Sequence, residues 1–114
     1  MRLHANRTYL FAPGNHERRV EKALGLGADV VILDLEDAVA VSEKKSTRGL
    51  INKTLKQPRN CAVCVRVNDY DTELCCGDIC SIVSENLDGI VLPKLESLED
   101  LRSIDWLLGN LEQE

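Results

Sequence analysis

Asp29-Val30-Val31-Ile32-Leu33-Asp34 is a stretch in which four apolar residues follow one another between two acids. A strand that is apolar at successive positions is buried on both faces, and such strands are typical of parallel sheets covered by helices. Three other β-prone runs lie along the 114-residue chain, at 8–12, 61–67 and 89–92. We therefore expect a parallel sheet of four strands.

An amphipathic stretch follows each of these runs, so strands and helices alternate along the chain. Gly27 suits the position just past the first helix, and the second helix is expected to run towards Leu55. The residues expected to cap the four helices are Asn15, Ser42, Thr72 and Ser97. The last helix is expected to bury Leu98, Leu101, Ile104, Leu108 and Leu111.

Four strand–helix units predict an α/β fold, for which two architectures remain open. One is a small open sheet with helices on both faces. The other is half of a TIM (βα)8 barrel, because a whole barrel needs about 250 residues. Neither a low-complexity linker nor a block of charge divides the chain, so we expect a single, partial barrel domain over residues 1–114.

The composition excludes several classes of protein. With 44% hydrophobic and 29% charged residues, the chain resembles a globular domain rather than a disordered one. A net charge of −5 is opposite to that of most nucleic-acid-binding proteins. No apolar run has the length of a signal peptide or of a membrane-spanning helix, so we expect a cytoplasmic protein that binds neither membranes nor nucleic acids.

Five cysteines raise the question of a zinc site. Cys61 and Cys64 have the CxxC spacing, but they lie in an expected strand, where positions three apart point to opposite faces. Cys76 and Cys80 are four apart on an expected helix and could share a face. We favour reduced, apolar cysteines and keep a small zinc protein as the weaker alternative.

Polar side chains follow every expected strand, where ligands of parallel α/β folds bind. Arg66 is distinctive among them, because Val65 and Val67 flank it in an apolar run and alternation places it on the other face. A guanidinium there can hold a carboxylate with two hydrogen bonds. The competing interpretation is a structural ion pair with Glu36 or Asp37. The residues singled out after the four strands are Pro13, Gly14 and Asn15; Asp34, Glu36 and Asp37; Arg66 and Asn68; and Lys94 and Glu96.

The acids after the second strand need compensation. Asp34, Glu36 and Asp37 cannot all stay ionised in a dry site without a metal ion, a basic partner or raised pKa values. Lys94 is a candidate partner, and oxygen ligands of this kind suit magnesium better than zinc.

The start of the first helix is a second candidate site. Its free N–H groups follow Pro13-Gly14-Asn15, and residues 1–22 hold five basic side chains against two acidic ones. This region could bind the phosphates of a nucleotide-like ligand, or it could be a solvated helix face.

Four segments in this order resemble the citrate lyase beta-subunit family, which includes the malyl-, citramalyl- and citryl-CoA lyases. They are RTYLFAPGN at 7–15, DLEDAV at 34–39, VRVN at 65–68 and GIVLPKLE at 89–96. The resemblance implies a TIM barrel that assembles into oligomers, with further copies or other lyase subunits as partners. It also implies magnesium-dependent retro-Claisen or retro-aldol cleavage of a CoA or acyl-carrier thioester into an acyl thioester and a 2-oxo acid, such as oxaloacetate or glyoxylate.

The same resemblance assigns roles to residues. Arg66 would contact substrate oxygens, with Asn68 beside it, and Glu36 and Asp37 would be active-site acids. Arg7 and Lys94 would bind substrate at the mouth of the barrel. Independently of the resemblance, the position of Pro13, Gly14 and Asn15 at the start of the first helix makes them our candidates for contact with a CoA-type ligand.

The metal ligands of this family are a Glu and an Asp that follow later strands, so no magnesium ligand is assigned within residues 1–114. We therefore expect the segment alone to be inactive as a lyase. The alternative to an enzyme is a non-catalytic half-barrel module that pairs with itself or with another chain.

Overall fold

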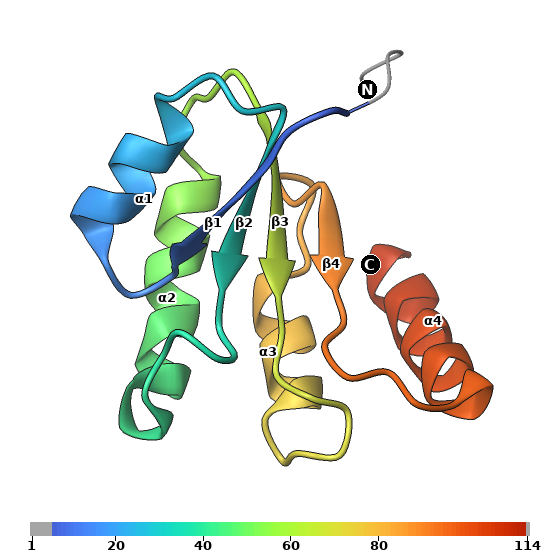
Figure 1. Cartoon of the computed structure of the whole chain (residues 1–114). Coiled ribbons are helices and arrows are strands. Elements are labelled where there is room, and N and C mark those ends of the chain that lie inside the picture. Colours follow the sequence, from blue (N-terminus) through green and yellow to red (C-terminus); the bar gives the residue numbers. More distant parts are fainter. Residues whose placement is uncertain (1–5, 114) are drawn as a thin grey trace.

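The computed structural model describes residues 6–113, which form a curved sheet with helices packed along it (Figure 1). No helix in this part of the chain is long and apolar enough to cross a membrane. The elements are β1 (Tyr9–Pro13), α1 (Glu17–Leu24), β2 (Val30–Asp34), the 3-10 turn η1 (Val41–Glu43), α2 (Lys44–Leu55), β3 (Ala62–Arg66), α3 (Cys75–Ile82), β4 (Gly89–Val91) and α4 (Leu98–Glu112).

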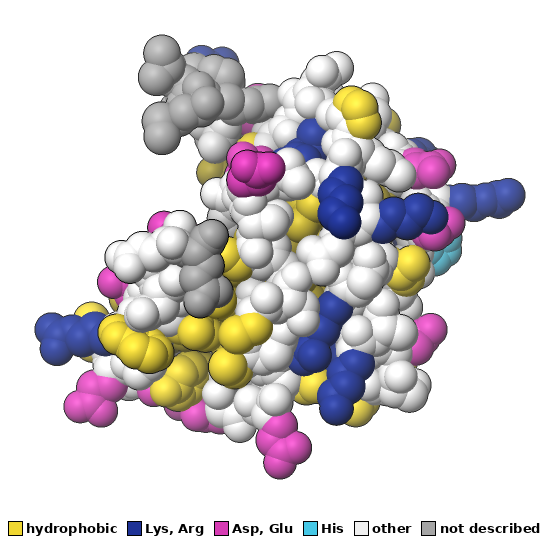
Figure 2. Space-filling view, turned by 180° about the vertical axis from the view of Figure 1, so that it is seen from behind, with side chains coloured by type: hydrophobic (Ala, Val, Ile, Leu, Met, Phe, Trp, Pro, Cys, Tyr) yellow, Lys and Arg dark blue, Asp and Glu magenta, His cyan; other side chains and the backbone are white. Residues whose placement is uncertain are grey.

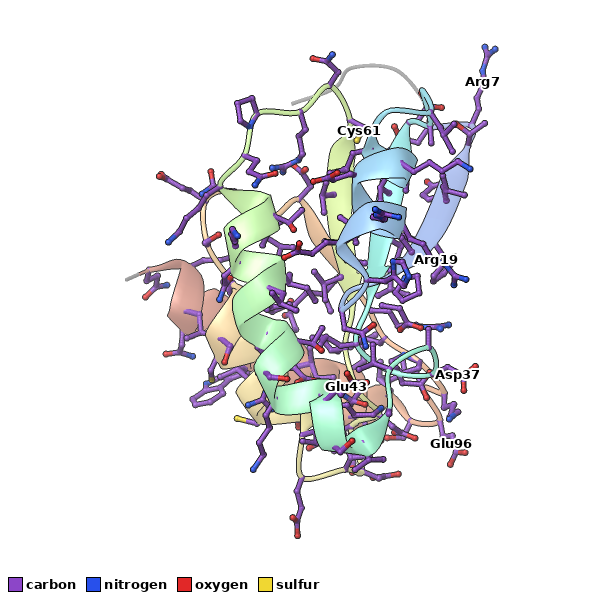
Figure 3. All side chains as sticks on the ribbon, turned by 90° about the vertical axis from the view of Figure 1, so that its left-hand side faces the viewer. Arg7, Arg19, Asp37, Glu43, Cys61 and Glu96 are labelled. Atoms are coloured by element: carbon purple, nitrogen blue, oxygen red, sulfur yellow. The ribbon has the colours of Figure 1, made fainter. Side chains whose placement is uncertain are left out.

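All four strands are parallel and lie in the order of the sequence, β1-β2-β3-β4. Sequential strands joined by right-handed crossovers place their helices on the same face of the sheet. Figures 1 and 3 show α1 and α2 on one side of the strands. The predicted α/β fold is confirmed, and the arrangement is that of a barrel segment rather than of an open sheet covered on both faces.

The core lies between the sheet and these helices. Val31, Leu33, Val63 and Val65 alternate along β2 and β3 and are completely buried. Residues from α1, α2 and α3 cover them, including Val20, Ala23, Ile51, Leu55, Ile79 and Ile82. The other face of the sheet carries Tyr9 and Phe11, which are 59% and 49% exposed.

Three of the four expected helix caps were wrong. His16, not Asn15, caps α1, because its Nδ1 atom accepts a hydrogen bond from the Arg19 backbone N–H. Ser42 lies inside η1, and Thr72 lies two residues before the N-cap of α3. Ser97 was correct: its hydroxyl accepts from the Asp100 N–H at 3.1 Å. The three wrong predictions share a cause. In each case the helix begins two or three residues after the expected cap rather than directly after it, because the chain is still turning there.

The expected apolar stripe of α4 is only partly buried. Ile104 is 4% exposed and Leu108 and Leu111 are half-buried, but Leu98 and Leu101 are 59% and 41% exposed. Among residues 6–113 the sheet ends at β4, so α4 has a covering neighbour on one side only.

Gly14 lets β1 end against β2. Its N–H donates to the Asp34 carbonyl oxygen at 2.9 Å. A Cβ atom on Gly14 would lie 2.8 Å from Ile51 Cδ1 and 2.9 Å from that same backbone oxygen. The close approach therefore requires glycine.

We expect Gly14→Ala to lower the free energy of unfolding by about 1–3 kcal/mol, because the clash includes a backbone atom that cannot move alone. The matched control is Gly49→Ala in the middle of α2, where a Cβ meets nothing within 4 Å. That change should raise stability by about 0.5–1 kcal/mol, and urea unfolding measures both. Equal effects of the two changes would contradict the packing role of Gly14.

Candidate active site

A small hollow of about 190 Å³ lies where the first three strands end. This is the end of a parallel sheet at which α/β enzymes bind their ligands. Its lining consists of Phe11, Ala12, Pro13, Asp34, Ala38 and Arg66.

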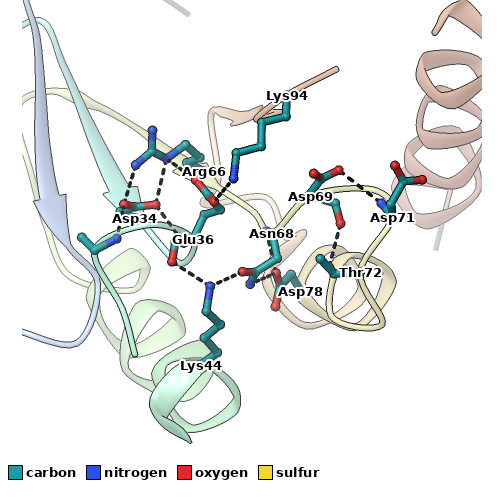
Figure 4. Close-up of polar contacts among 11 residues, drawn as sticks. Asp34, Glu36, Lys44, Arg66, Asn68, Asp69, Asp71, Thr72, Asp78 and Lys94 are labelled. Atoms are coloured by element: carbon teal, nitrogen blue, oxygen red, sulfur yellow. Dashed lines mark hydrogen bonds and ion pairs between the residues drawn. The ribbon is translucent and has the colours of Figure 1, made fainter. Parts of the chain in front are cut away.

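The central contact of this hollow is an ion pair between Asp34 and Arg66 (Figure 4). The two residues are register partners on β2 and β3. Arg66 Nε lies 2.9 Å from Asp34 Oδ1, and Nη2 lies 2.6 Å from Oδ2. The Asp34 side chain is 2% exposed and that of Arg66 25%. This two-pronged geometry is the strong form of the arginine–carboxylate contact.

Asp34 also organises the turn that follows β2. Its carboxylate accepts the backbone N–H groups of Glu36 at 2.8 Å and Ala38 at 3.0 Å. Burial raises the pKa of Asp34, but the hydrogen bonds from Arg66 and from these two N–H groups together lower it below its ordinary value. Asp34 is therefore a fixed anion near neutral pH and is unsuited to act as a proton acceptor.

Arg66 is held so that one side of its guanidinium stays available. Nε and Nη2 contact Asp34, whereas Nη1 has no hydrogen-bond acceptor among residues 6–113. The guanidinium carbon lies 4.8 Å from the centre of the Phe11 ring, in cation–π contact. The main partner is Asp34 rather than Glu36 or Asp37, since Glu36 Oε1 is 3.8 Å from Nε.

Lys94 and Glu36 form a second pair at the same rim. Lys94 Nζ donates to Glu36 Oε2 at 3.0 Å, as expected from the need to compensate the acids. This hydrogen bond raises the pKa of Lys94. Lys94 has φ 51°, a left-handed conformation that is uncommon for a residue with a side chain. This backbone conformation redirects the chain after β4, and the Lys94 side chain then reaches Glu36.

A chain of buried polar groups supports the rim from below, and the sequence patterns missed it. Lys44 Nζ donates to the Glu36 carbonyl oxygen and to Asn68 Oδ1. Asn68 donates through its backbone N–H and its side-chain amide to Asp78 Oδ2, and Asp78 Oδ1 accepts from Arg48 Nε at 2.9 Å. Periodicity gave no signal for Lys44, Arg48 or Asp78, because each lies within an ordinary helical pattern.

Asn68 and Arg7 lie elsewhere than expected. Asn68 is 2% exposed and its amide is used inside the protein, so it holds the loop after β3 and does not face the hollow. Arg7 precedes β1, and its backbone N–H donates to Asp29 Oδ2 at 2.7 Å. Figure 3 shows Arg7 at the end of the sheet opposite to Asp37 and Glu96. A strand of this length separates its two ends by about 16 Å. Arg7 therefore does not lie at the mouth, contrary to the expectation.

The Pro13-Gly14-Asn15 segment is less open than expected. Proline has no N–H, the Gly14 N–H bonds to Asp34, and the Asn15 amide donates to Glu43 Oε2 at 3.2 Å. Pro13 does line the hollow. Asp37 is exposed, and it is the next residue, Ala38, that lines the hollow. Arg2, one of the five basic residues counted towards a phosphate site, lies outside the described residues.

Two of the five cysteines, Cys76 and Cys80, lie close together on α3. Burial raises the pKa of the Cys64 thiol, and it raises that of Cys75 to about 11. The Cys76 and Cys80 sulfur atoms are 4.0 Å apart on the exposed side of α3. Within residues 6–113, no three His, Cys, Asp or Glu side chains lie together as metal ligands would. We assign no zinc site to these cysteines.

Residues 7–114 match the family described as HpcH/HpaI aldolase/citrate lyase. The chain belongs to this family. It is 42% identical over 111 residues to a (3S)-malyl-CoA thioesterase of Cereibacter sphaeroides and 36% identical over 110 residues to the citrate lyase subunit beta of Leuconostoc mesenteroides. Each match covers 95% of this chain but only 39% and 36% of the relative, so the chain spans less than half of their length.

The fold comparison agrees with the family. The citrate lyase beta subunit of Mycobacterium tuberculosis, solved with oxaloacetate and magnesium, superposes with a TM-score of 0.74 at 33% identity. The match covers 88% of this chain and 44% of that one. The four strand–helix units therefore correspond to part of a TIM-barrel-like protein, and the expected family resemblance is confirmed.

We expect Asp34→Asn to lower the free energy of unfolding by about 1.5–3 kcal/mol, because it removes the charge that holds Arg66 and fits the neighbouring N–H groups less well. Asp37→Asn is the matched control, since Asp37 is exposed, and it should change stability by less than about 0.5 kcal/mol. Urea unfolding at pH 7 measures both. If Asp34→Asn left the free energy of unfolding unchanged, the ion pair between Asp34 and Arg66 would contribute nothing to folding.

The lowered pKa of Asp34 also predicts a pH dependence. The folded-state pKa lies below the ordinary value of 3.8, so the contribution of Asp34 is fully present above about pH 4 and is lost as pH falls through the folded-state pKa. Urea unfolding between pH 6 and pH 2 should show this loss in the wild type and a weaker loss in Asp34→Asn. If the free energy of unfolding fell equally with pH in the two proteins, the lowered pKa of Asp34 would not be the cause of the loss.

Proposed function

We propose that the chain supplies the substrate-binding rim of a lyase that cleaves a malyl-CoA- or citryl-CoA-type thioester, and that Arg66 binds a carboxylate of the 2-oxo acid. One observation carries this proposal: Arg66 is buried enough to be fixed, yet keeps Nη1 available beside a hollow at the carboxyl ends of the strands. The names of the relatives support the substrate class, because one acts on (3S)-malyl-CoA and another was solved with oxaloacetate.

The size of the hollow favours the small acid over the whole thioester. About 190 Å³ is below the roughly 300–1,000 Å³ of pockets that enclose drug-sized ligands. A C3 or C4 2-oxo acid can place a carboxylate there, and the CoA or carrier-protein portion would then extend outside the hollow. Lys94 is 64% exposed at the same rim and is suited to a second carboxylate.

The reaction breaks the bond between the hydroxyl-bearing carbon and the carbon next to the thioester. The hydroxyl proton leaves, the carbon–oxygen bond becomes a carbonyl, and the electron pair of the broken bond passes to the thioester as an enolate, which then takes up a proton. Arg66 would hold the carboxylate adjacent to the new carbonyl and so fix the leaving fragment. We propose Glu36 as the residue that positions Arg66 and Lys94, with Asp37 as an open carboxylate at the rim.

The described residues do not fit a magnesium site of their own. Both Asp34 oxygens are held by Arg66 and backbone N–H groups, and Glu36 is paired with Lys94. A carboxylate committed in this way is a poor metal ligand, because binding a cation would require it to give up these partners. We therefore assign substrate binding to this segment and no metal-dependent step.

We expect oxaloacetate to bind the chain and to shift the NMR signals of the Phe11, Ala38 and Arg66 region. Arg66→Lys should weaken this binding at least about tenfold, because an ammonium cannot bond Asp34 and a substrate carboxylate with the same fork. The matched control, Arg102→Lys on exposed α4, should bind like the wild type. Thermal unfolding of each variant separates lost binding from lost folding.

Two outcomes would contradict this assignment. The first is that oxaloacetate does not bind the chain, and the second is that it binds equally well after Arg66→Lys. Either result would favour the non-catalytic half-barrel module. Conversely, Arg66-dependent turnover of (3S)-malyl-CoA by the chain alone would show that its role is more than binding. The products identify the reaction, since carbon–carbon cleavage gives glyoxylate and acetyl-CoA, whereas thioester hydrolysis gives malate and free CoA.

A further inference from the structure

Two thiols lie next to each other on the exposed side of α3. Cys76 and Cys80 are four residues apart, a spacing that brings side chains together on one face of a helix, and both are exposed. Their sulfur atoms are 4.0 Å apart. The hollow at the rim is lined by other residues, so the proposed lyase function makes no use of this pair.

The pair lies along a groove between α3 and α4. Cys76 lines a hollow together with Trp106 of α4, and Cys80 lines a second hollow with Leu111 and Glu112 further along the same helix. Figure 1 shows α3 between α2 and α4, and Figure 2 shows hydrophobic side chains gathered around α4, at the left of that view. The thiols therefore lie between two helices of the described chain, and not at an outer edge of its sheet.

The three cysteines of α3 divide between the two sides of the helix. Cys75 is 4% exposed and belongs to the core, together with Ile79 and Ile82. Cys76 and Cys80 are on the exposed side. The exposed side of α3 therefore offers two sulfur ligands to an ion that arrives from solvent.

The separation of the two sulfur atoms matches one bridging ion. With metal–sulfur bonds of about 2.3 Å, two thiolates on one ion stand about 3.8 Å apart at a tetrahedral angle and about 4.6 Å apart in a straight line. The observed 4.0 Å lies within this range, so the helix already holds the sulfur atoms at the distance that an ion requires.

A disulfide fits the same pair less well. The Cβ atoms of a disulfide lie about 3.5–4.5 Å apart, whereas Cβ atoms four residues apart on a helix are about 5–6 Å apart. Direct oxidation of the pair would therefore distort α3, and a bridging ion would not.

We propose that Cys76 and Cys80 bind one soft monovalent metal ion, of which Cu(I) is the type. Thiolates are the ligands that select Cu(I), and two of them complete its coordination, whereas a structural zinc site uses four ligands. On binding, each thiol releases its proton to solvent and two metal–sulfur bonds form, while the ion keeps its oxidation state. The site is independent of the proposed lyase reaction, because it shares no residue with the rim.

The experiment is an oxygen-free titration of the whole, fully reduced chain with Cu(I), in competition with a coloured Cu(I) chelator. We expect one tightly bound ion per chain, and X-ray absorption should show two sulfur neighbours around it. Cys76→Ser and Cys80→Ser should each weaken binding at least about a hundredfold, because losing a ligand costs more than losing one of its outer hydrogen-bond partners.

The matched control keeps the number of thiols and moves one of them. Cys80→Ser with Ser81→Cys places the second thiol five residues from Cys76, about 140° around the helix, where the two sulfur atoms cannot reach one ion. Ser81 is exposed, so the exchange leaves the core unchanged. This variant should bind as weakly as Cys80→Ser.

A second control, Cys61→Ser, removes a thiol outside α3 and should bind like the wild type. Circular dichroism should show that every variant is folded. Three results would overturn the proposal: the wild type binds Cu(I) no more tightly than the variant with the moved thiol, Cys61→Ser weakens binding as much as Cys80→Ser, or the pair prefers Zn(II) to Cu(I).

Discussion

The ion pair between Asp34 and Arg66 joins the ends of β2 and β3 at the point where the sheet meets the hollow. Asp34 also accepts the N–H groups of Glu36 and Ala38, and its carbonyl oxygen accepts the N–H of Gly14 at the end of β1. One residue thus ties three strands and the turn after β2 to each other. A buried carboxylate with this many donors is stable only while all of them stay in place, so the rim behaves as one unit.

This arrangement also explains how Arg66 can be both structural and able to bind a ligand. The interpretation from sequence treated the two roles as alternatives. The structure makes the two roles compatible: Nε and Nη2 are held by Asp34, whereas Nη1 has no hydrogen-bond acceptor among residues 6–113 and is left for the ligand-binding role proposed above. The face of Phe11 restricts the guanidinium further. A cation whose orientation is already fixed loses less entropy when it binds a carboxylate.

Patterns of hydrophobicity predicted the strands, their parallel order and the outward position of Arg66, because burial on both faces and alternation along a strand are local properties of the sequence. The contact of Lys94 with Glu36 was also accessible, since strand ends in a parallel sheet meet at one edge. Lys44, Asp78 and the burial of Asn68 were not accessible, because they depend on how α2 and α3 pack beneath the rim. The error on Arg7 arose from a motif that begins before the strand, so that its first residue and its last lie at opposite ends of β1.

The order of the strands accounts for both the rim and the open face beside it. Parallel strands in sequence order bring every strand end to one rim, and right-handed crossovers place the helices on one face. The same order leaves the other face of the sheet without helices among residues 6–113, so Phe11 on that face can lie against the Arg66 guanidinium at the rim.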